Sequence, residues 1–375
     1  MEKKYFIVHI GAAKAGSTAI QEFLALNRQK LLAAGIHLYV PGDYNDVCKA
    51  LLTPYHIHQH PVETELFQNP TLYPLIYHNL NAHDVLTKWQ KSLLIHKDKH
   101  ILISSEAFFH GHPKRNLKSA EMLRIIFDPF KNSHKLYIVA YLRRQDESLH
   151  SIYQQWSRND CFRVPFSKFK SIYPPFAENS FLGHTLDYSR LIMPYKDSLK
   201  DLEPIYHLKS FDQAKIEKDG LLGDFKSKTI IKELQLQRPE GAQNVGVNRW
   251  LAIMLMLGSD FPQHDRVLWY QMLANSPRAK AQSEKFSFLT AAERLAVQNH
   301  YFQSNKELFG FNDTMMKKFF GETKRIDLNE KVNYEDISKA LAANLIRINK
   351  QLQSKMRKNL NGYSFPPFIT NPPRA

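Results

Sequence analysis

The fold is decided by residues 5–24, which read YFIVHIGAAKAGSTAIQEFL. Residues 5–10 are mostly apolar and predict a strand, whereas residues 17–24 carry apolar side chains at helical spacing. Two glycines, Gly11 and Gly16, stand in the turn between them. A strand, a glycine loop and a helix N-terminus in this order predict a cradle for an anion. The glycines let the backbone approach the ligand, and backbone amides and the helix dipole point at it.

The lysine of this loop does not stand where the nucleotide-kinase pattern G-x-x-x-x-G-K-[ST] has it. Ser17 and Thr18 follow the second glycine directly, and the lysine comes earlier, at Lys14. The resulting pattern, G-x-x-K-x-G-S-T, resembles the 5′-phosphosulfate loop of sulfotransferases that use 3′-phosphoadenosine 5′-phosphosulfate (PAPS). A tight turn with a surface lysine is the alternative interpretation. The resemblance implies that Lys14 contacts the oxygen bridging phosphate and sulfate, without a metal, and that PAPS is bound by Gly11, Ala13, Lys14, Ala15, Gly16, Ser17 and Thr18.

A second candidate element begins at residue 136. Residues 136–142, LYIVAYL, form a continuous apolar run typical of a buried parallel strand, and Arg143 follows. Sulfotransferases carry an arginine at the end of such a strand and a serine eight residues later, which here is Ser151. By this resemblance Arg143 and Ser151 bind the 3′-phosphate of PAPS, since a guanidinium fork matches phosphate oxygens. Gln145 stands where many members have proline, a form similar to a bacterial branch that acts on polysaccharides.

The charges around this strand end support an anion site. Arg143 and Arg144 precede the N-terminus of the expected helix, where positive charge is unfavourable unless an anion binds. The alternative is a solvated, charged first turn with no ligand.

A third polar position lies between the first two. Residues 99–109, KHILISSEAFF, predict a short strand that ends in polar residues. Sulfotransferases place their general base at the end of the corresponding strand, and by this resemblance Glu106 would accept the proton of the acceptor hydroxyl. The alternative is that Glu106 orients a loop, for example by pairing with Lys14. The competing candidates for the base are His9, His110 and His112.

Composition favours a large globular protein with anionic partners. The chain has 375 residues, 43% of them hydrophobic, and a formal net charge of +15. Such a charge suits a nucleotide, an acidic glycan, nucleic acid or a membrane surface. The basic residues are not grouped into a nucleic-acid-binding motif, so no nucleic acid is expected. Two cysteines, Cys48 and Cys161, imply no disulfide framework and suit a reducing compartment.

No targeting or membrane-spanning segment is recognisable. The first apolar run is too short for a signal peptide, and nothing approaches the ~18 apolar residues of a spanning helix. Many eukaryotic carbohydrate sulfotransferases have an N-terminal anchor. Because no such anchor is recognisable in this sequence, we expect a cytoplasmic bacterial protein. Peripheral attachment to a membrane through basic residues stays open.

The order of elements predicts an α/β fold of the P-loop type, in which a central parallel sheet is flanked by helices. We expect one sulfotransferase domain over 1–375, with an α/β core in 1–240 and a mainly helical extension in 241–375 that completes the acceptor side. An irregular insertion at about 43–80 belongs to the acceptor side as well. The expected strands are 5–10, 36–40, a short strand within 99–109, 136–142 and 205–208. The expected helices are 17–35, 84–96, 119–130, 187–200, 223–236, 250–258, 291–309 and 334–355.

Three further features give weaker hypotheses. The alternating His56, His58 and His60 have no carboxylate or cysteine partner fixed by spacing, so no metal is expected. The glycine-rich residues 239–248 would form either a loop over the nucleotide, with Asn244, Asn248 and Arg249 as candidates, or a plain linker. The tail, 364–375, contains four prolines and is expected to be extended.

The function implied is transfer of a sulfuryl group from PAPS to a hydroxyl of a polysaccharide, lipopolysaccharide or glycolipid, with 3′,5′-ADP as product. Two alternatives stay open. The first is a nucleotide phosphotransferase that requires Mg²⁺. The second is a non-catalytic protein of the same fold that binds nucleotide or glycan.

Overall fold

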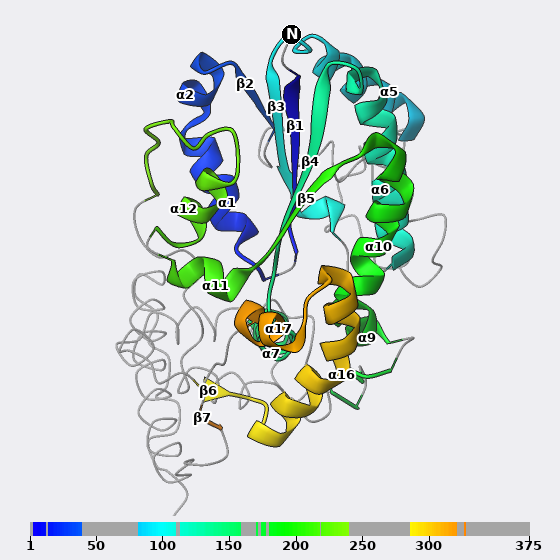
Figure 1. Cartoon of the computed structure of the whole chain (residues 1–375), viewed down its shortest axis with the longest axis vertical. Coiled ribbons are helices and arrows are strands. Elements are labelled where there is room, and N and C mark those ends of the chain that lie inside the picture. Colours follow the sequence, from blue (N-terminus) through cyan, green and yellow to red (C-terminus); the bar gives the residue numbers. More distant parts are fainter. Residues whose placement is uncertain are drawn as a thin grey trace, which may run out of the picture.

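The computed structural model describes residues 3–12, 14–39, 82–109, 113–158, 170–171, 174–177, 180–217, 219–239, 286–320 and 326–327. Within these ranges a five-stranded sheet lies between two layers of helices (Figure 1). The expected α/β class, with a central parallel sheet flanked by helices, is therefore confirmed.

All five strands of the large sheet are parallel, in the order β2-β3-β1-β4-β5. The glycine loop therefore follows the central strand and is flanked by the carboxyl ends of β3 and β4. A separate parallel pair, which the sequence did not predict, joins β6 and β7. The strands are β1 (Lys4–Ile10), β2 (Ile36–Tyr39), β3 (His100–Ser105), β4 (His134–Leu142), β5 (Ile205–Ser210), β6 (Phe286–Ser287) and β7 (Ile326–Asp327).

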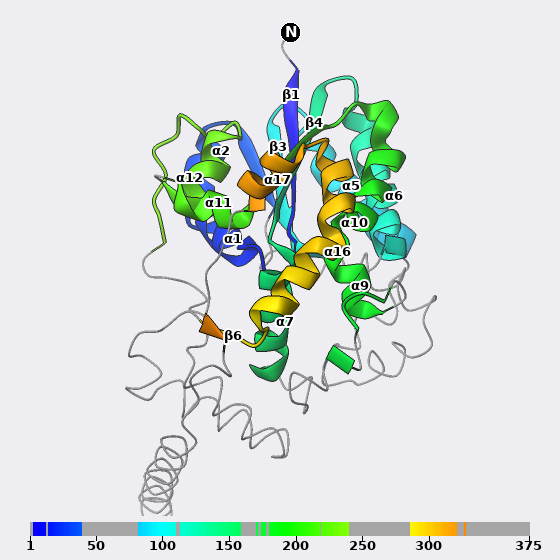
Figure 2. The ribbon, with the colours of Figure 1, turned by 60° about the horizontal axis from the view of Figure 1, so that its bottom comes forward.

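The helices divide between the two faces of the sheet and its carboxyl edge. Figures 1 and 2 show α1, α2, α11 and α12 over one face and α5, α6 and α10 over the other, with α7, α16 and α17 beyond the carboxyl end of β4. Their bounds are α1 (Ser17–Leu26), α2 (Arg28–Ala33), α5 (Ala82–Leu94), α6 (Pro113–Phe127), α7 (Gln145–Arg158), α9 (Phe181–Leu186), α10 (Tyr188–Leu199), α11 (Phe211–Ile216), α12 (Gly220–Ser227), α16 (Ala291–Phe309) and α17 (Asp313–Phe320).

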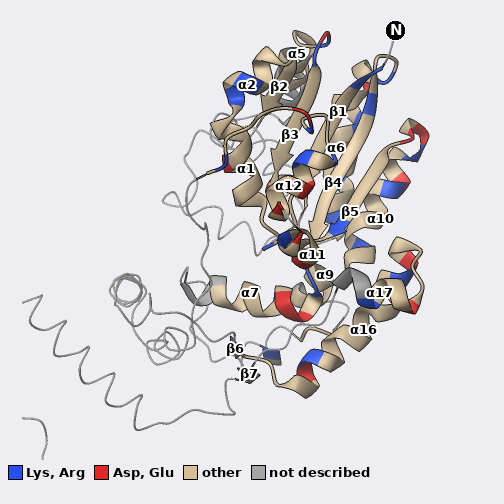
Figure 3. Cartoon of the chain, turned by 60° about the vertical axis from the view of Figure 1, so that its left-hand side comes forward, with Lys and Arg blue, Asp and Glu red and all other residues tan. Residues whose placement is uncertain are grey.

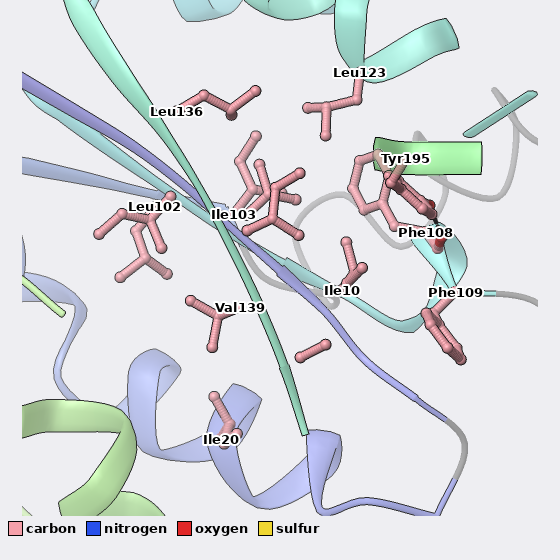
Figure 4. Packing of buried hydrophobic residues seen from close by; sticks show 14 of the residues in the cluster. Ile10, Ile20, Leu102, Ile103, Phe108, Phe109, Leu123, Leu136, Val139 and Tyr195 are labelled. Carbon is pink, nitrogen blue, oxygen red and sulfur yellow. Dashed lines mark hydrogen bonds between the residues drawn. The ribbon is translucent and has the colours of Figure 1, made fainter. Parts of the chain in front are cut away.

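The core fills both spaces between sheet and helices, because strands buried on both faces alternate their side chains between the two layers. Ile20 of α1 lies on the same side of the sheet as Val139 and Leu102 (Figure 4). On the opposite side lie Ile10, Ile103 and Phe108, together with Leu123 of α6 and Tyr195 of α10, whose hydroxyl donates to the carbonyl of Phe108. This two-sided burial holds the carboxyl ends of the strands at one rigid edge.

Two expected helix boundaries were wrong, and Asn27 explains part of both errors. The helix expected over 17–35 is divided into α1 and α2 at Asn27, whose amide nitrogen donates to the carbonyls of Phe23 and Gln237, each at 2.8 Å. Its side-chain oxygen accepts from the backbone N–H of Gln237. The helix expected over 223–236 instead ends as α12 at Ser227, and the chain beyond it is drawn to Asn27.

Other helices also differ from expectation, and α9 and α17 were not predicted. Helix α6 begins at Pro113 rather than residue 119, because proline is well suited to the first turn of a helix. Helix α11 was not predicted; the hydroxyl of Ser210 caps it by accepting from the N–H of Gln213. The strands β1, β2, β4 and β5 and the helix α16 agree with their expected places to within two residues.

Several expectations lie outside the described residues. They are the insertion at 43–80, the helices at 250–258 and 334–355, the three alternating histidines, both cysteines, the late-loop candidates Asn244, Asn248 and Arg249, and the tail.

Candidate functional site

The carboxyl edge of the sheet gathers the polar segments that the sequence analysis singled out. Ile10 lies beside Ser105, and Leu142 lies beside Ser210, so β1, β3, β4 and β5 end next to one another. The N–H of Gly11 donates to the carbonyl of Ser105 at 3.4 Å, which joins the glycine loop to the carboxyl end of β3. In open parallel sheets this edge is where ligands bind.

The glycine loop is a tight turn held by its own backbone. The N–H of Ala15 donates to the carbonyl of Ala12 at 3.2 Å, and Lys14 and Gly16 have φ angles of 63° and 83°. A left-handed conformation costs about 1–3 kcal/mol at a residue other than glycine, so Lys14 is strained in this turn. Gly16 directly precedes the first turn of α1 and caps it without a side chain. The first backbone amides of α1 therefore face the loop, as an anion cradle requires.

The two hydroxyls after the loop have different surroundings. Ser17 is buried, and its hydroxyl lies 3.5 Å from the carbonyl of Ala12, within the loop itself. Thr18 is exposed. Of the other loop residues, Ala12 and Ala15 are buried in the core, and Ala13 lies outside the described residues.

The two glycines are required by contacts within the protein. A Cβ at Gly11 would lie 2.4 Å from the hydroxyl of Ser17 and 3.0 Å from Cγ of Glu106. A Cβ at Gly16 would lie 2.4 Å from Leu221 and 2.7 Å from the ring of Phe211. Each glycine therefore lets another segment of the chain pack against the loop.

Glu106 stands beside the loop. It is the first residue of a short 3₁₀ turn, Glu106–Phe108, and its side chain is exposed although Phe108 and Phe109 anchor the turn in the core. Glu106 is close to Gly11, so the candidate base and the candidate phosphosulfate loop lie side by side.

Arg143 leaves the end of β4 and reaches toward the glycine loop. One guanidinium nitrogen lies 3.5 Å from the carbonyl of Lys14, and the guanidinium carbon lies 5.5 Å from the centre of the Phe211 ring. Two carboxylates lie close as well, that of Glu147 at 3.5 Å and that of Asp212 at 3.9 Å. Arg143 therefore joins the loop after β1, the first turn of α7 and the start of α11.

Arg144 corrects the electrostatic argument for an anion site. Its guanidinium is buried, donates to both oxygens of Asp146 at 2.6 and 2.9 Å, and lies 3.7 Å from Glu147. Burial alone would lower the pKa of Arg144, but these carboxylates outweigh it and raise the pKa. The two arginines at this helix end are therefore compensated within the chain, and their presence by itself does not require a bound anion.

Ser151 lies half-buried on α7, two turns beyond Arg143. Buried polar side chains of α7 hold this helix against the rest of the protein. The ring of His150 accepts from the N–H of Phe288 at 3.3 Å and lies 2.9 Å from the amide of Gln154. The amide of Gln145 donates to the side chain of Asn305 on α16 at 3.0 Å.

His9 does not face the edge of the sheet. Its side chain is 1% exposed, and its ring packs near Tyr141 and Phe225 between the sheet and α12. Burial lowers the pKa of His9 to about 3, and one ring nitrogen lies 2.7 Å from the hydroxyl of Ser104. His9 is therefore enclosed in the core, where its ring is held neutral. The other competing bases, His110 and His112, lie outside the described residues.

A buried ion cluster anchors α12, and with it Leu221, to the sheet. Asp224 is 3% exposed, accepts from the hydroxyl of Tyr141 at 2.7 Å and pairs with Lys209. Burial by itself raises the pKa of Asp224, but its contacts with His207, Lys209 and Tyr141 outweigh burial and hold the pKa well below its usual range.

Sequence reasoning missed Phe211, Asp212 and the role of Glu147. Phe211 and Asp212 directly follow β5, so their place after an apolar strand was the available signal. Their closeness to Arg143 depends on β5 lying next to β4, which no local pattern specifies.

None of the helices in the ranges given above is long and apolar enough to cross a membrane. In the same ranges, no group of three or more His, Cys, Asp or Glu residues is placed to hold a metal ion.

Comparison with known proteins shows a distant likeness to a solved structure. No protein-family model matches the chain, and no curated protein matches it. Among solved structures, the chain is similar to a sulfotransferase from Alicyclobacillus acidocaldarius, with 11% identity and a TM-score of 0.37, covering 75% of this chain and 100% of that one.

Proposed function

We propose that the protein is a sulfotransferase that transfers the sulfuryl group of PAPS to a hydroxyl of a carbohydrate acceptor. The observation that carries the proposal is the 3.5 Å approach of Arg143 to the carbonyl of Lys14. The two elements that resemble the 5′-phosphosulfate and 3′-phosphate sites of PAPS arise about 130 residues apart in the chain, yet they meet at one edge of the sheet. A ligand with anionic groups at two separate positions fits such a pair of sites.

The chain's residues take distinct roles in this proposal. The amides at the start of α1 and the ammonium of Lys14 stabilise the negative charge that develops on the leaving phosphate oxygen. Arg143 and Ser151 hold the 3′-phosphate, which distinguishes PAPS from ATP. Glu106 accepts the proton of the acceptor hydroxyl. PAPS supplies the sulfuryl group: a bond from the acceptor oxygen to sulfur forms, the bond from sulfur to the bridging oxygen breaks, and 3′,5′-ADP leaves.

The acceptor and the setting are proposals of the same kind. The net charge of +15 favours an acidic polysaccharide or lipopolysaccharide, and a glycolipid would also satisfy the chemistry. A cytoplasmic location without a metal cofactor accords with this enzyme class.

Calorimetric titration with 3′,5′-ADP, ATP and ADP, each with and without Mg²⁺, tests the proposal. We expect 3′,5′-ADP to bind most tightly and without need of Mg²⁺. The matched pair of variants is Arg143→Ala, which removes the proposed anchor, and Arg124→Ala, which removes an exposed arginine paired with Asp201. Only the first should weaken binding, by about thirty-fold or more, because charge-assisted bonds to phosphate are lost.

The other outcomes would overturn the proposal. Preference for ATP with Mg²⁺ would favour a phosphotransferase. Tight binding of 3′,5′-ADP without sulfation of any acceptor from PAPS would favour a binding protein. Absence of nucleotide binding would contradict both enzyme functions and leave a glycan-binding protein of the same fold.

A further inference from the structure

The end of the sheet opposite to the candidate site carries a dense group of lysines. Three segments form it: residues 3–4, 95–99 and 131–135, which lead into or begin the adjacent strands β1, β3 and β4. Half of these twelve residues are lysines, and the only acidic residue among them is Asp98. We call this surface the basic pole, and Figure 3 shows the Lys and Arg colour gathered on the loops near the N-terminal end of β1. Its lysines are Lys3, Lys4, Lys97, Lys99, Lys131 and Lys135.

The three segments of the basic pole touch one another. The ammonium of Lys3 lies 3.4 Å from the carbonyl of Lys131, and the N–H of Lys4 donates to the carbonyl of Ser133 at 3.0 Å. The ring of His134 lies 2.9 Å from the carbonyl of Lys99. The lysines therefore belong to one continuous surface, although they come from three places in the sequence.

Asp98 and other nearby acidic groups cancel part of this charge, and the surface remains positive. Asp128 forms an ion pair with Lys131 at 2.9 Å. Nearer to β5, the carboxylate of Asp201 forms an ion pair with Arg124. Glu203 lies on the same side, next to η4 (Lys200–Leu202). The histidines of this end, His37, His96 and His134, have pKa values lowered by burial and add no charge at neutral pH.

The chemistry of the basic pole suits a diffuse anionic surface. Lysine is a compact charge on a flexible stem, whereas arginine provides the rigid fork that recognises a single phosphate or sulfate group. The segments of the basic pole contain six lysines and no arginine. Ile95, which stands between α5 and Lys97, is 75% exposed, so an apolar side chain projects among the charges. A bilayer surface offers both many phosphates and an apolar boundary, whereas a dissolved polyanion offers only the first.

We propose that the basic pole docks the protein on a membrane rich in anionic phospholipid, with Ile95 entering the interface. The candidate site faces away from the bilayer in this orientation. A strand rises about 3.3 Å per residue, so the seven residues of β1 place the glycine loop roughly 20–25 Å above the lipid surface. An acceptor, if the proposed function holds, would then be a glycan that projects from the membrane rather than a lipid headgroup.

Co-sedimentation of the full chain with vesicles tests this inference. The vesicles contain phosphatidylcholine alone or phosphatidylcholine with phosphatidylglycerol. The test variant replaces Lys97, Lys99, Lys131 and Lys135 by glutamine. The control variant makes the same change of charge at exposed lysines on other surfaces, Lys114, Lys228, Lys232 and Lys317. Circular dichroism and thermal melting verify that both variants are folded.

We expect the protein to bind only the anionic vesicles, and to be released by salt because the attraction is screened. The test variant should lose about tenfold or more of its partition coefficient, and the control variant less than about threefold. Ile95→Ser should weaken vesicle binding about five-fold without changing binding to dextran sulfate, since only a bilayer has an apolar interior.

Three results would overturn the inference. Equal losses in the two lysine variants would mean that net charge, not the basic pole, is responsible. Equal binding to neutral vesicles would remove the electrostatic basis. Binding to dextran sulfate through the basic pole, without binding to anionic vesicles, would identify a soluble polyanion as the partner.

Discussion

At Arg143 three kinds of contact meet: a backbone carbonyl, an aromatic face and two carboxylates. The nearest charged side chains at this edge almost balance one another, so an incoming phosphate has to compete with Glu147 and Asp212 for the same guanidinium. Glu147 comes from the helix that follows Arg143, whereas Asp212 is brought to Arg143 by the pairing of β5 with β4.

Replacing Asp212 by asparagine should tighten binding of 3′,5′-ADP by about five-fold at low salt, because a negative charge near the proposed phosphate is removed while the side-chain shape is kept. Calorimetry measures the effect. Asp219→Asn makes the same charge change at an exposed residue that pairs with Arg238, and should leave the affinity unchanged. Weaker binding in Asp212→Asn would mean that the carboxylate positions Arg143 instead of competing with the ligand.

Lys14 and Arg143 should affect different kinetic constants. Lys14→Ala should lower kcat by about a hundred-fold, because the lysine stabilises charge that appears only in the transition state. Arg143→Ala should mainly raise the Kd of the nucleotide. Rate measurements with PAPS, alongside nucleotide titrations, separate the two effects. Full activity in both variants would refute the assigned roles.

At the scale of elements, the loop between β1 and α1 is shaped by what packs on it. Leu221 of α12 and Phe211 of α11 occupy the space that a side chain at Gly16 would need. The Asp224 cluster holds α12 against the sheet, so the position of the loop depends on helices that arise 200 residues later. Glycine is therefore needed at position 16 both for the positive φ of the turn and for the space that Leu221 and Phe211 occupy.

Gly16→Ala should therefore destabilise the protein more than Gly35→Ala. Both residues have positive φ, 83° and 75°, but a Cβ at Gly35 meets nothing within 4 Å. We expect a loss of about 1 kcal/mol in the free energy of unfolding for Gly35→Ala, from backbone strain alone. For Gly16→Ala we expect about 3 kcal/mol, since overpacking adds to strain. Urea unfolding measures both losses. Equal losses would show that the packing of Leu221 and Phe211 against Gly16 does not affect the free energy of unfolding.

At the scale of the whole molecule, buried histidines make the fold sensitive to acid. Burial lowers the pKa of His9 to about 3, and burial, followed by the nearby His96, Lys99 and Arg28, lowers that of His37 to about 4. Both histidines therefore take up a proton more readily in the unfolded chain. Stability is fully present above the unfolded pKa of about 6.5 and falls as the pH drops toward the folded values.

The free energy of unfolding should fall by about 3 kcal/mol between about pH 7 and pH 5, with the larger share from His9 because His37 is only half-buried. Urea unfolding at both pH values measures the difference. In His9→Gln the same pH step should cost about 2 kcal/mol less than in the parent protein, whatever the variant's stability at neutral pH. An unchanged pH dependence in the variant would contradict the buried, neutral state of His9.

The central elements of the fold were predictable because their signals are local. The apolar run of β1, the glycine loop and the start of α1 follow from residues 5–24 alone, and β4 with Arg143 follows from residues 136–143. Helix α16 agrees with its expected bounds, since Thr290 and Glu293 form a capping box at its start and Gly310 ends it. Where a distant residue intervenes, as Gln237 does at Asn27, the helix boundary was wrong.

The sequence by itself determined that a strand, a glycine loop and a helix open an α/β protein, and that an arginine ends a buried strand. Periodicity and turn residues act over a few positions, and they suffice for such elements. Only the tertiary structure decided which residues surround Arg143, that His9 is enclosed in the core, and that six lysines share one end of the sheet. The physical reason is the strand order β2-β3-β1-β4-β5, because contacts between strands distant in the chain depend on packing that no local pattern records.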